Sequence, residues 1–301
     1  MDHRPFLKLL TFVSSITSLA TAQDSELELQ QIELILADGI EAKLFASEPM
    51  IQAPTNMDID YRGRVWINEG VNYREVRDPR GDRIMILEDI DGDGVADSAK
   101  EFYRGNDVNA AMGLCVLGNR VFVSSAPNII MLTDTDGDDK ADQKTLLFSG
   151  IGGIQHDHSV HAVVFGPDGK LYFPIGNTGA VSLNDAEGNP ARDSAGKLIE
   201  DYPQGKVYRC DLDGSNLETI GWNFRNPYEV CVDSFGNLWQ SDNDDGGSPA
   251  VRINQVFEFG DHGYRSIVRS KGPITGADPR PEVAHWHQND PGVVPNLLLT
   301  G

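Results

Sequence analysis

The sequence predicts an all-β protein, a β-propeller built from four-stranded blades, and three observations support this prediction. Gly and Pro are frequent, with 31 and 16 of the 301 residues. No long stretch shows the 3.6-residue apolar period of a helix, so turns and strands should dominate. Four segments repeat one pattern, in which a turn around Gly is followed by an alternating or aromatic strand.

The four repeated segments define the architecture. They cover residues 60–67, 117–123, 167–173 and 233–240, with glycines at 63, 118, 169 and 236. Gly supplies the positive φ of a tight hairpin turn, and β-branched or aromatic residues suit the pleated strand after it. The glycines are 55, 51 and 67 residues apart, and one hairpin per unit of this length is typical of four-stranded propeller blades. The longest spacing contains residues 184–204, which we interpret as a surface loop inserted between strands. A β-sandwich with coincidental hairpins is the alternative.

The number of repeats predicts an incomplete ring. Six blades at this period need roughly 330 residues, whereas about 265 follow residue 35. We therefore expect a propeller of the six-bladed type, truncated after about four to five blades, with residues 36–301 as the partial propeller. An open ring leaves strand edges unpaired.

The charge of the chain excludes one class of partner. Lys and Arg total 25 against 46 Asp and Glu, which gives a net charge of -21. Binding to nucleic acid needs a basic face, so this composition argues against it. The acidic excess instead favours hard cations such as Ca²⁺.

Residues 1–22 have the layout of a secretory signal peptide. Arg4 and Lys8 form a basic head, apolar and small residues follow, and an A-x-A cleavage site ends at Ala22. The apolar stretch is too short to span a bilayer. We therefore expect an exported protein, periplasmic or extracellular, in which residues 23–35 form a linker. A buried N-terminal helix is the alternative.

Three cysteines remain after the signal peptide: Cys115, Cys210 and Cys231. Export permits one disulfide, and the odd number leaves its pairing open. Cys210 and Cys231 both lie in strand-like runs. A pair of reduced core cysteines is therefore an equal alternative.

Two acidic loops have the spacing of calcium sites. Their carboxylates stand at Asp89, Asp91, Asp93 and Asp97, and at Asp134, Asp136, Asp138 and Asp142. Relative positions 1, 3, 5 and 9 wrap oxygens around one cation, and the position-7 carbonyls of Val95 and Lys140 would complete the set. Position 6 needs positive φ, which suits Gly94 better than Asp139. We expect blade-linking loops in which Ca²⁺ is a structural ligand; two solvated Asp/Gly turns are the alternative.

Three of the seven histidines, His156, His158 and His161, lie within six residues. They directly precede a strand-like run, and a polar loop that enters a strand at a propeller mouth is a common place for a site. Imidazole can act as a general base, and the neighbouring Asp157 could orient it. A metal site is one alternative, since residues 285–287 repeat the His-x-His spacing. Ordinary structural histidines are the other.

Arg225 and Asn226 stand before Pro227 and the fourth hairpin. An Arg that is fixed at a loop end by Asn and Pro suits binding of a carboxylate or quinone oxygen through its planar fork. A solvated Arg on a surface turn is the alternative. An oxygen-rich loop, residues 241–247, follows the fourth hairpin.

These motifs together resemble a known family. Residues 158–172 and 176–179 look like the core of the glucose/sorbosone dehydrogenase propellers, and residues 225–227, 236–242 and 260–264 continue the resemblance in the right order. The similarity spans residues 40–270. Four further segments are similar to the "membrane-bound dehydrogenase" domain proteins of planctomycete-type bacteria, which include PVC-type haem-binding proteins: residues 45–49, 68–74, 241–244 and 285–296.

The resemblance implies roles for four residues. Members of the family hold pyrroloquinoline quinone (PQQ) and Ca²⁺ over the propeller mouth. His158 matches the base that takes the proton of the sugar hydroxyl, and Asp157 would contact substrate or His158. Arg225 and Asn226 match the pair that contacts the cofactor.

The resemblance also implies a cofactor calcium and a redox partner. Asp244 and Asp245 match the stretch whose main-chain oxygens hold the cofactor Ca²⁺, although the family has Gly-Pro where these carboxylates stand. Many planctomycete-type members carry a cytochrome c domain further along the chain. If this chain is part of a longer protein, that protein could also be membrane-associated.

The sequence leads to one leading hypothesis and two alternatives. The leading hypothesis is an exported PQQ- and calcium-type dehydrogenase-like propeller that oxidises a small-molecule sugar or other alcohol. The first alternative is a non-catalytic, calcium-stabilised propeller that binds glycans or proteins. The second is a metal-dependent, lactonase-like hydrolase whose His and Asp clusters are ligands.

Overall fold

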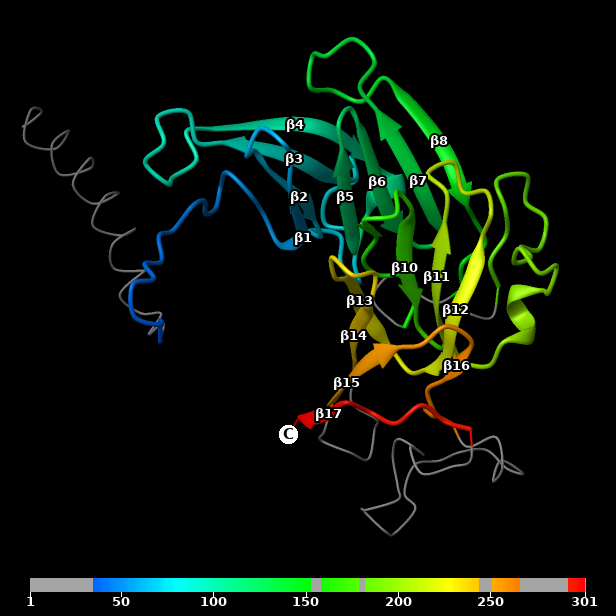
Figure 1. Ribbon diagram of the computed structural model, residues 1–301. Coiled ribbons are helices and arrows are strands. Elements are labelled where there is room, and N and C mark those ends of the chain that lie inside the picture. Colours follow the sequence, from blue (N-terminus) through cyan, green and yellow to red (C-terminus); the bar gives the residue numbers. More distant parts are fainter. Residues whose placement is uncertain (1–34, 153–157, 179–181, 244–250, 266–291, 301) are drawn as a thin grey trace, which may run out of the picture.

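The computed structural model describes residues 35–152, 158–178, 182–243, 251–265 and 292–300. Four sheets fan around one axis and form the blades of a β-propeller, which confirms the predicted fold (Figure 1). The described residues contain no α-helix, only short 3₁₀ turns. No helix among them is long and apolar enough to cross a membrane.

Blades 1 and 2 are simple meanders in which each strand pairs antiparallel with the next. Blade 1 consists of β1 (Pro54–Ile59), β2 (Val65–Glu69), β3 (Asp82–Glu88) and β4 (Ser98–Gly105). Blade 2 consists of β5 (Gly113–Leu117), β6 (Arg120–Ser125), β7 (Asn128–Thr133) and β8 (Gln143–Phe148). The 3₁₀ turn η1 (Asn106–Val108) joins the two blades.

The chain after residue 256 contributes strands to both blade 3 and blade 4. Blade 3 consists of β9 (Val164–Phe165), β10 (Leu171–Ile175), β11 (Gly205–Cys210) and β12 (Glu218–Phe224). Blade 4 consists of β13 (Pro227–Val232), β14 (Leu238–Asp242), β15 (Val251–Val256) and β17 (Leu298–Thr300). Strand β16 (Gly260–Asp261) leaves blade 4 and adds to β12 in parallel, whereas β17 returns to pair with β15. The described residues therefore form four blades, with no fifth sheet among them.

The four predicted hairpins join the first two strands of each blade. Their turn glycines, Gly63, Gly118, Gly169 and Gly236, have φ values of +81°, +64°, +82° and +84°. The predicted insertion lies between β10 and β11 and contains the 3₁₀ turn η3 (Ile199–Asp201). Hairpin turns with left-handed residues match the twist of the strands that they join, and this explains why the repeat could be read from sequence.

The hydrophobic core lies between the blades rather than inside one sheet. One buried cluster joins blades 1 and 2 and includes Trp66 and Val121. A second joins blades 2 and 3 around Phe122 and Tyr208, and a third joins blades 3 and 4 around Phe224. Face-to-face burial of apolar side chains is the dominant favourable term in such packing, so each blade holds its neighbours in place.

The first strands of the blades surround a central cavity of about 290 Å³. Its lining comes from all four blades: Asn56 to Asp58, Leu114 to Leu117, Val163 to Phe165, and Glu229. These strands all begin at one end of the molecule, since the Tyr228 hydroxyl near the start of β13 donates to Thr55 O near the start of β1. We call this end the mouth. The opposite end, which carries the four hairpin turns, is the far end.

All three cysteines are free, so the predicted alternative of a disulfide is wrong. Cys115 and Cys210 are buried, and burial raises the pKa of both thiols to about 12. Cys231 is exposed, so of the pair expected in the core only Cys210 lies there.

Candidate functional site

His158 lies at the mouth, where the chain enters blade 3. Its side chain is half-buried and its backbone is left-handed, with φ of +50°. Gly176 packs against this backbone so closely that an added Cβ would lie 2.5 Å from His158 O. The Thr178 hydroxyl donates to the same carbonyl at 3.2 Å. The end of β10 therefore fixes the position of His158.

Asn177 connects His158 to Arg225. Its side-chain oxygen Oδ1 faces His158 Nδ1 at hydrogen-bond distance, and its main-chain N–H donates to Arg225 O at 2.8 Å. Because an amide oxygen only accepts, Nδ1 carries the proton and the lone pair of neutral His158 is on Nε2. Sequence analysis assigned no role to Asn177, although residues 176–179 belong to the family motif.

Asp242 holds the main chain of the Arg225–Asn226 turn. Its carboxylate accepts the N–H of Asn226 at 2.7 Å and the N–H of Arg225 at 3.0 Å. Asp242 pairs in register with Pro227, which has no N–H to offer the sheet. The Asp242 side chain on β14 thus accepts both main-chain N–H groups that precede the proline. Sequence analysis included Asp242 in the oxygen-rich loop of residues 241–247 without a role of its own, whereas it is the last residue of β14.

Arg252 on β15 neutralises Asp242. Its Nη2 and Nε donate to Asp242 Oδ2 at 2.7 and 3.1 Å, and both side chains are 0% exposed. Burial lowers the pKa of Arg252, and the charge of Asp242 opposes that shift. Removing one partner of such a pair leaves an uncompensated buried charge, which is strongly destabilising.

His161 is a structural histidine. It is 3% exposed, its Nδ1 donates to Pro227 O at 2.9 Å, and its ring stacks on Tyr228 with centroids 5.3 Å apart. Burial lowers its pKa. Of the predicted cluster, only His158 therefore faces the mouth in the described part of the chain. His156, Asp157 and the histidines at 285 and 287 lie outside the described residues, as do Asp244 and Asp245.

His262 lies in the turn of residues 260–264, which carries part of the family resemblance, and its side chain is buried. It is 0% exposed and stacks on Phe224 with centroids 4.4 Å apart. Burial, aided by the charge of Arg252, lowers its pKa to about 3. Asn223, with φ of +67°, holds this turn by donating from Nδ2 to Asp261 Oδ1 at 2.6 Å. The side chain of His262 is therefore neutral and part of the interior.

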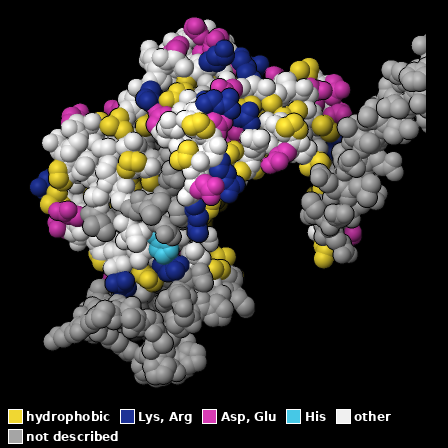
Figure 2. Space-filling model, turned by 180° about the vertical axis from the view of Figure 1, so that it is seen from behind, with side chains coloured by type: hydrophobic (Ala, Val, Ile, Leu, Met, Phe, Trp, Pro, Cys, Tyr) yellow, Lys and Arg dark blue, Asp and Glu magenta, His cyan; other side chains and the backbone are white. Residues whose placement is uncertain are grey.

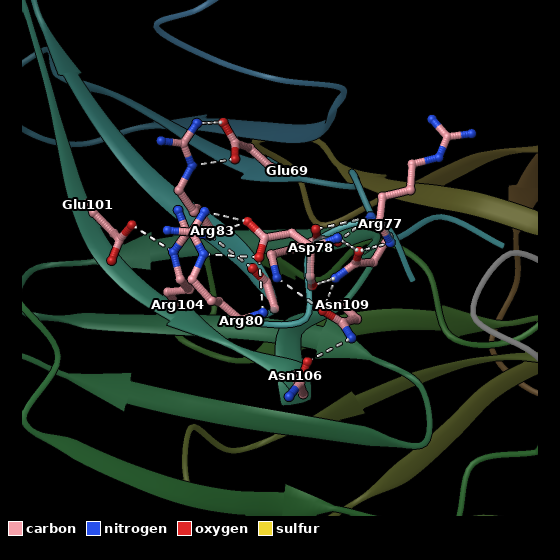
Figure 3. A network of polar contacts seen from close by, with 12 residues as sticks. Glu69, Arg77, Asp78, Arg80, Arg83, Glu101, Arg104, Asn106 and Asn109 are labelled. Carbon is pink, nitrogen blue, oxygen red and sulfur yellow. Dashed lines mark hydrogen bonds and ion pairs between the residues drawn. The ribbon is translucent and has the colours of Figure 1, made fainter. Parts of the chain in front are cut away.

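A network of ion pairs and amide contacts fixes the rim of blade 1 at the mouth (Figure 3). Arg83 meets Glu69 through two bonds of 2.6 Å. Asp78 pairs with Arg80 at 2.7 Å and with Arg104 at 3.1 Å, and the bond from Arg80 is the main cause of its lowered pKa. These arginines are thus matched by carboxylates. Basic and acidic side chains are likewise interspersed on the face shown in Figure 2.

The two acidic loops lie at the far end, away from His158. They connect β3 to β4 and β7 to β8, so the prediction that they link blades is wrong, because each lies within one blade. Ligand oxygens gather within 4.8 Å of one another in each loop: Asp89, Asp91 and Asp97 in the first, and Asp134, Asp136 and Asp138 in the second. The sixth positions, Gly94 and Asp139, have φ of +86° and +62°, as the spacing requires.

The remaining predicted loop residues take part in local contacts. Asp93 approaches Lys43 Nζ at 3.5 Å, and its Oδ1 accepts the N–H of Val95 at 2.8 Å. In the second loop, Lys140 N–H donates to Asp138 Oδ1 at 2.9 Å. Asp142 accepts the hydroxyl of Thr135 at 2.6 Å.

The second loop fastens blade 2 to blade 1. Asp139 bonds Arg64 of blade 1 at 2.8 Å, and Arg64 also bonds Asp60 at 2.8 Å. Both side chains of the Arg64–Asp60 pair are at most 8% exposed. The acidic loops and His158 lie at opposite ends, so among the described residues the His and Asp clusters do not form one ligand set. This arrangement disfavours the hydrolase alternative.

Comparison with known proteins assigns this arrangement to a class and to a family. The chain is a β-propeller that resembles a quinoprotein glucose dehydrogenase over part of its sequence and sugar dehydrogenases in its fold. It belongs to the family described as "Domain of unknown function (DUF7133)", whose profile matches residues 25–282.

The curated relative quinoprotein glucose dehydrogenase B of Acinetobacter calcoaceticus is 30% identical over 135 residues. The match covers 38% of this chain and 27% of the relative, so the chain spans about a quarter of that protein's length.

Solved structures share the fold at low identity. A Trichoderma reesei protein of Carbohydrate-Active Enzymes Family AA12 is 15% identical, with a TM-score of 0.60, and the match covers 88% of this chain and 71% of that one. The PQQ-bound aldose sugar dehydrogenase of Streptomyces coelicolor is 14% identical, with a TM-score of 0.55 and coverage of 83% and 69%. The PQQ domain of pyranose dehydrogenase from Coprinopsis cinerea is 15% identical, with a TM-score of 0.51 and coverage of 71% and 54%.

Proposed function

We propose that this chain is the catalytic propeller of an exported quinoprotein dehydrogenase that oxidises a sugar or another small alcohol. One observation carries the proposal: Asn177 joins His158 and Arg225 at the mouth, through its side chain to the first and its main chain to the second. The segments that carry a candidate base and a candidate anion-binding residue thus meet at one opening. The names of the similar proteins support PQQ as the cofactor class.

The residues at the mouth fit PQQ, which carries carboxylate and quinone oxygens and one ring N–H. Asn226 Oδ1 is buried and has no hydrogen-bond partner among the described residues, and an unpartnered buried acceptor calls for a donor from outside. Arg225 beside it has the planar set of donors that recognises carboxylates. When bound, PQQ would supply the two-electron acceptor for the oxidation. Arg225 and Asn226 would hold it.

His158 would act as the general base. With Nδ1 donating to Asn177, its Nε2 can take the proton of a substrate hydroxyl. Asn177 would keep the imidazole in this tautomer and orientation, and Gly176 would allow the close approach of the two segments. These two residues would position the base without any carboxylate in contact with it in the described part of the chain.

We also propose that both acidic loops bind Ca²⁺ as a structural ion. Each gathers three carboxylates around one point, which is unfavourable without a cation because like charges repel. Ca²⁺ should therefore raise the melting temperature of the full chain, and EDTA should reverse the rise. Asp134→Asn should weaken this response, whereas Glu187→Gln, an exposed carboxylate outside the loops, should not. A melting temperature that does not respond to Ca²⁺ in the unsubstituted protein would contradict the proposal.

Export and the redox partner complete the proposed function. Residues 1–22 would direct secretion and 23–35 would be the linker before the propeller of residues 36–301. Electrons from the sugar or alcohol would pass to a one-electron carrier such as a cytochrome c domain.

The decisive experiment is titration of the full chain with PQQ and Ca²⁺, followed by dye-reduction assays with aldoses and simple alcohols. We expect saturable PQQ binding and substrate-dependent dye reduction. Binding without turnover would favour the non-catalytic, ligand-binding alternative. If the chain neither bound PQQ nor reduced the dye, the dehydrogenase proposal would be rejected.

A further inference from the structure

The Arg225–Asn226 turn rests on a buried ion pair for which the family resemblance gives no role. Asp242 accepts the main-chain N–H groups of both turn residues, at 3.0 and 2.7 Å. Arg252 donates twice to the same carboxylate, at 2.7 and 3.1 Å. Arg252 also contacts His262 O and Asn296 Oδ1, so the pair is also tied to two segments that follow β15 in the chain.

We propose that Asp242 is the positioning residue of the cofactor-holding turn, and that Arg252 holds its carboxylate in place. This proposal rests on the proposed function, since the turn matters only if Arg225 and Asn226 hold a ligand. Asp242 acts through the main chain of these two residues, and its own carboxylate is 0% exposed and does not reach the mouth.

The geometry explains why a carboxylate is needed at this position. Pro227 interrupts the pairing of β13 with β14, and the register shifts between Pro227 and Val230. The two half-buried N–H groups before the proline have Asp242 as their acceptor, and loss of such a hydrogen bond costs stability. Each of the two N–H groups has its own oxygen of Asp242 as acceptor. Asn offers one acceptor and Leu offers none.

The test uses amide hydrogen exchange and PQQ affinity rather than activity. The first variant is Asp242→Glu, which keeps the charge pair but moves the carboxylate by one methylene. The second is Asp242→Leu with Arg252→Met, which replaces the buried pair by apolar groups of similar size, a change that other buried pairs tolerate without loss of stability. In both variants we expect exchange at the amides of residues 225 and 226 to become at least ten-fold faster, while exchange in β11 stays unchanged. The Kd for PQQ should rise at least ten-fold at a melting temperature near that of the unsubstituted protein.

A matched control lies at the far end of the same molecule. Asp60 and Arg64 form a related buried pair, in which Asp60 Oδ1 accepts the main-chain N–H groups of Arg62 and Arg64 and Oδ2 accepts Arg64 Nε. Asp60→Leu with Arg64→Met should leave amides 225 and 226 and the PQQ affinity unchanged.

Normal protection of both amides and an unchanged Kd in the Asp242→Glu protein would overturn the proposal, even if the double variant failed to fold. Failure of the unsubstituted protein to bind PQQ would instead reject the proposed function. The exchange rates would then still decide whether Asp242 positions the turn.

Discussion

The hairpin turns at the far end and the His158–Arg225 site at the mouth are held by contacts of different range along the chain. At the far end, the Asp233 carboxylate accepts N–H groups from Phe235 and Asn237, two and four residues away. At the mouth, the contacts from Asn177 to His158 and from Asp242 to Arg225 span 19 and 17 residues. The contact from Tyr228 to Thr55 spans 173 residues.

This difference has a consequence for function. A turn that satisfies its own donors forms wherever its few residues occur, and it tolerates changes elsewhere in the molecule. The mouth exists only when blades 1, 3 and 4 are all in place, because its side chains come from strand ends that are far apart in sequence. We therefore expect substitutions at the mouth to change chemistry, and substitutions at the far end to change stability alone.

The largest effect should come from His158→Gln. Glutamine keeps an acceptor at this place but cannot take a proton, and a positioned general base is worth roughly 10²- to 10⁴-fold in rate. We expect kcat for dye reduction to fall by about that factor, with the melting temperature unchanged because the side chain is only half-buried. Glu187→Gln is the control. A kcat within threefold of the unsubstituted enzyme would show that another group is the base.

The second effect should come from Gly176→Ala, which tests how tightly the mouth is packed. The new methyl group would lie 2.5 Å from His158 O and 2.6 Å from His158 Cα, and backbone cannot yield as a flexible side chain does. A shift of the base by about 1 Å costs on the order of 100-fold in rate. We expect kcat to fall by about that factor, with a smaller change in KM. Unchanged kinetics would mean that His158 is not held by Gly176.

The difference in range also explains how much could be read from the sequence. The hairpins around Gly63, Gly118, Gly169 and Gly236 were predicted because a positive φ and the strand after it are properties of a few adjacent residues. Their spacing then predicted the blades and, with them, the fold. The left-handed sixth positions of the acidic loops were predictable for the same reason.

The mouth could be predicted only in part. His158 and Arg225 were found through a motif, but the residues that connect and hold them, Asn177 and Asp242, have no local signature. An Asn after a Gly, or an Asp at the end of a strand, is common in any β protein. Their roles follow from blade packing, which brings β10, the start of β13 and the end of β14 to one opening. For the same reason, the sequence could not predict that β16 crosses to blade 3 while β17 returns to blade 4.

A smaller effect should appear in the pH dependence of stability, through His262 behind the mouth. Its pKa is about 3 in the folded chain, against 6.5 for an ordinary histidine. Between these values the unfolded chain binds a proton that the folded chain does not, so the free energy of unfolding should fall as pH falls. The slope for one such group is up to about 1.4 kcal/mol per pH unit.

The measurement is denaturant unfolding between pH 6.5 and 4.5, compared with His262→Gln. The variant should show the shallower slope. Asp233→Asn at the far end should leave the slope between pH 6.5 and 4.5 unchanged. The pKa of Asp233 is lowered to about 2, so this carboxylate titrates below that pH range. Equal slopes in the unsubstituted and His262→Gln proteins would show that His262 is accessible to protons.

The smallest effect should come from Gly169→Ala, which is the far-end counterpart of Gly176→Ala in the same blade. Gly169 has φ of +82° and nothing within 4 Å of an added Cβ, so the only cost is the left-handed backbone, about 1 kcal/mol. We expect denaturant unfolding to show this loss and kinetics to show none, because no contact of the turn reaches the mouth. The two variants add the same methyl group beside the two ends of β10. A difference between their kcat values therefore comes from the position of the methyl group and not from the type of substitution. If Gly169→Ala lowered kcat as Gly176→Ala does, the strand would transmit strain along its length and the two ends would not be independent.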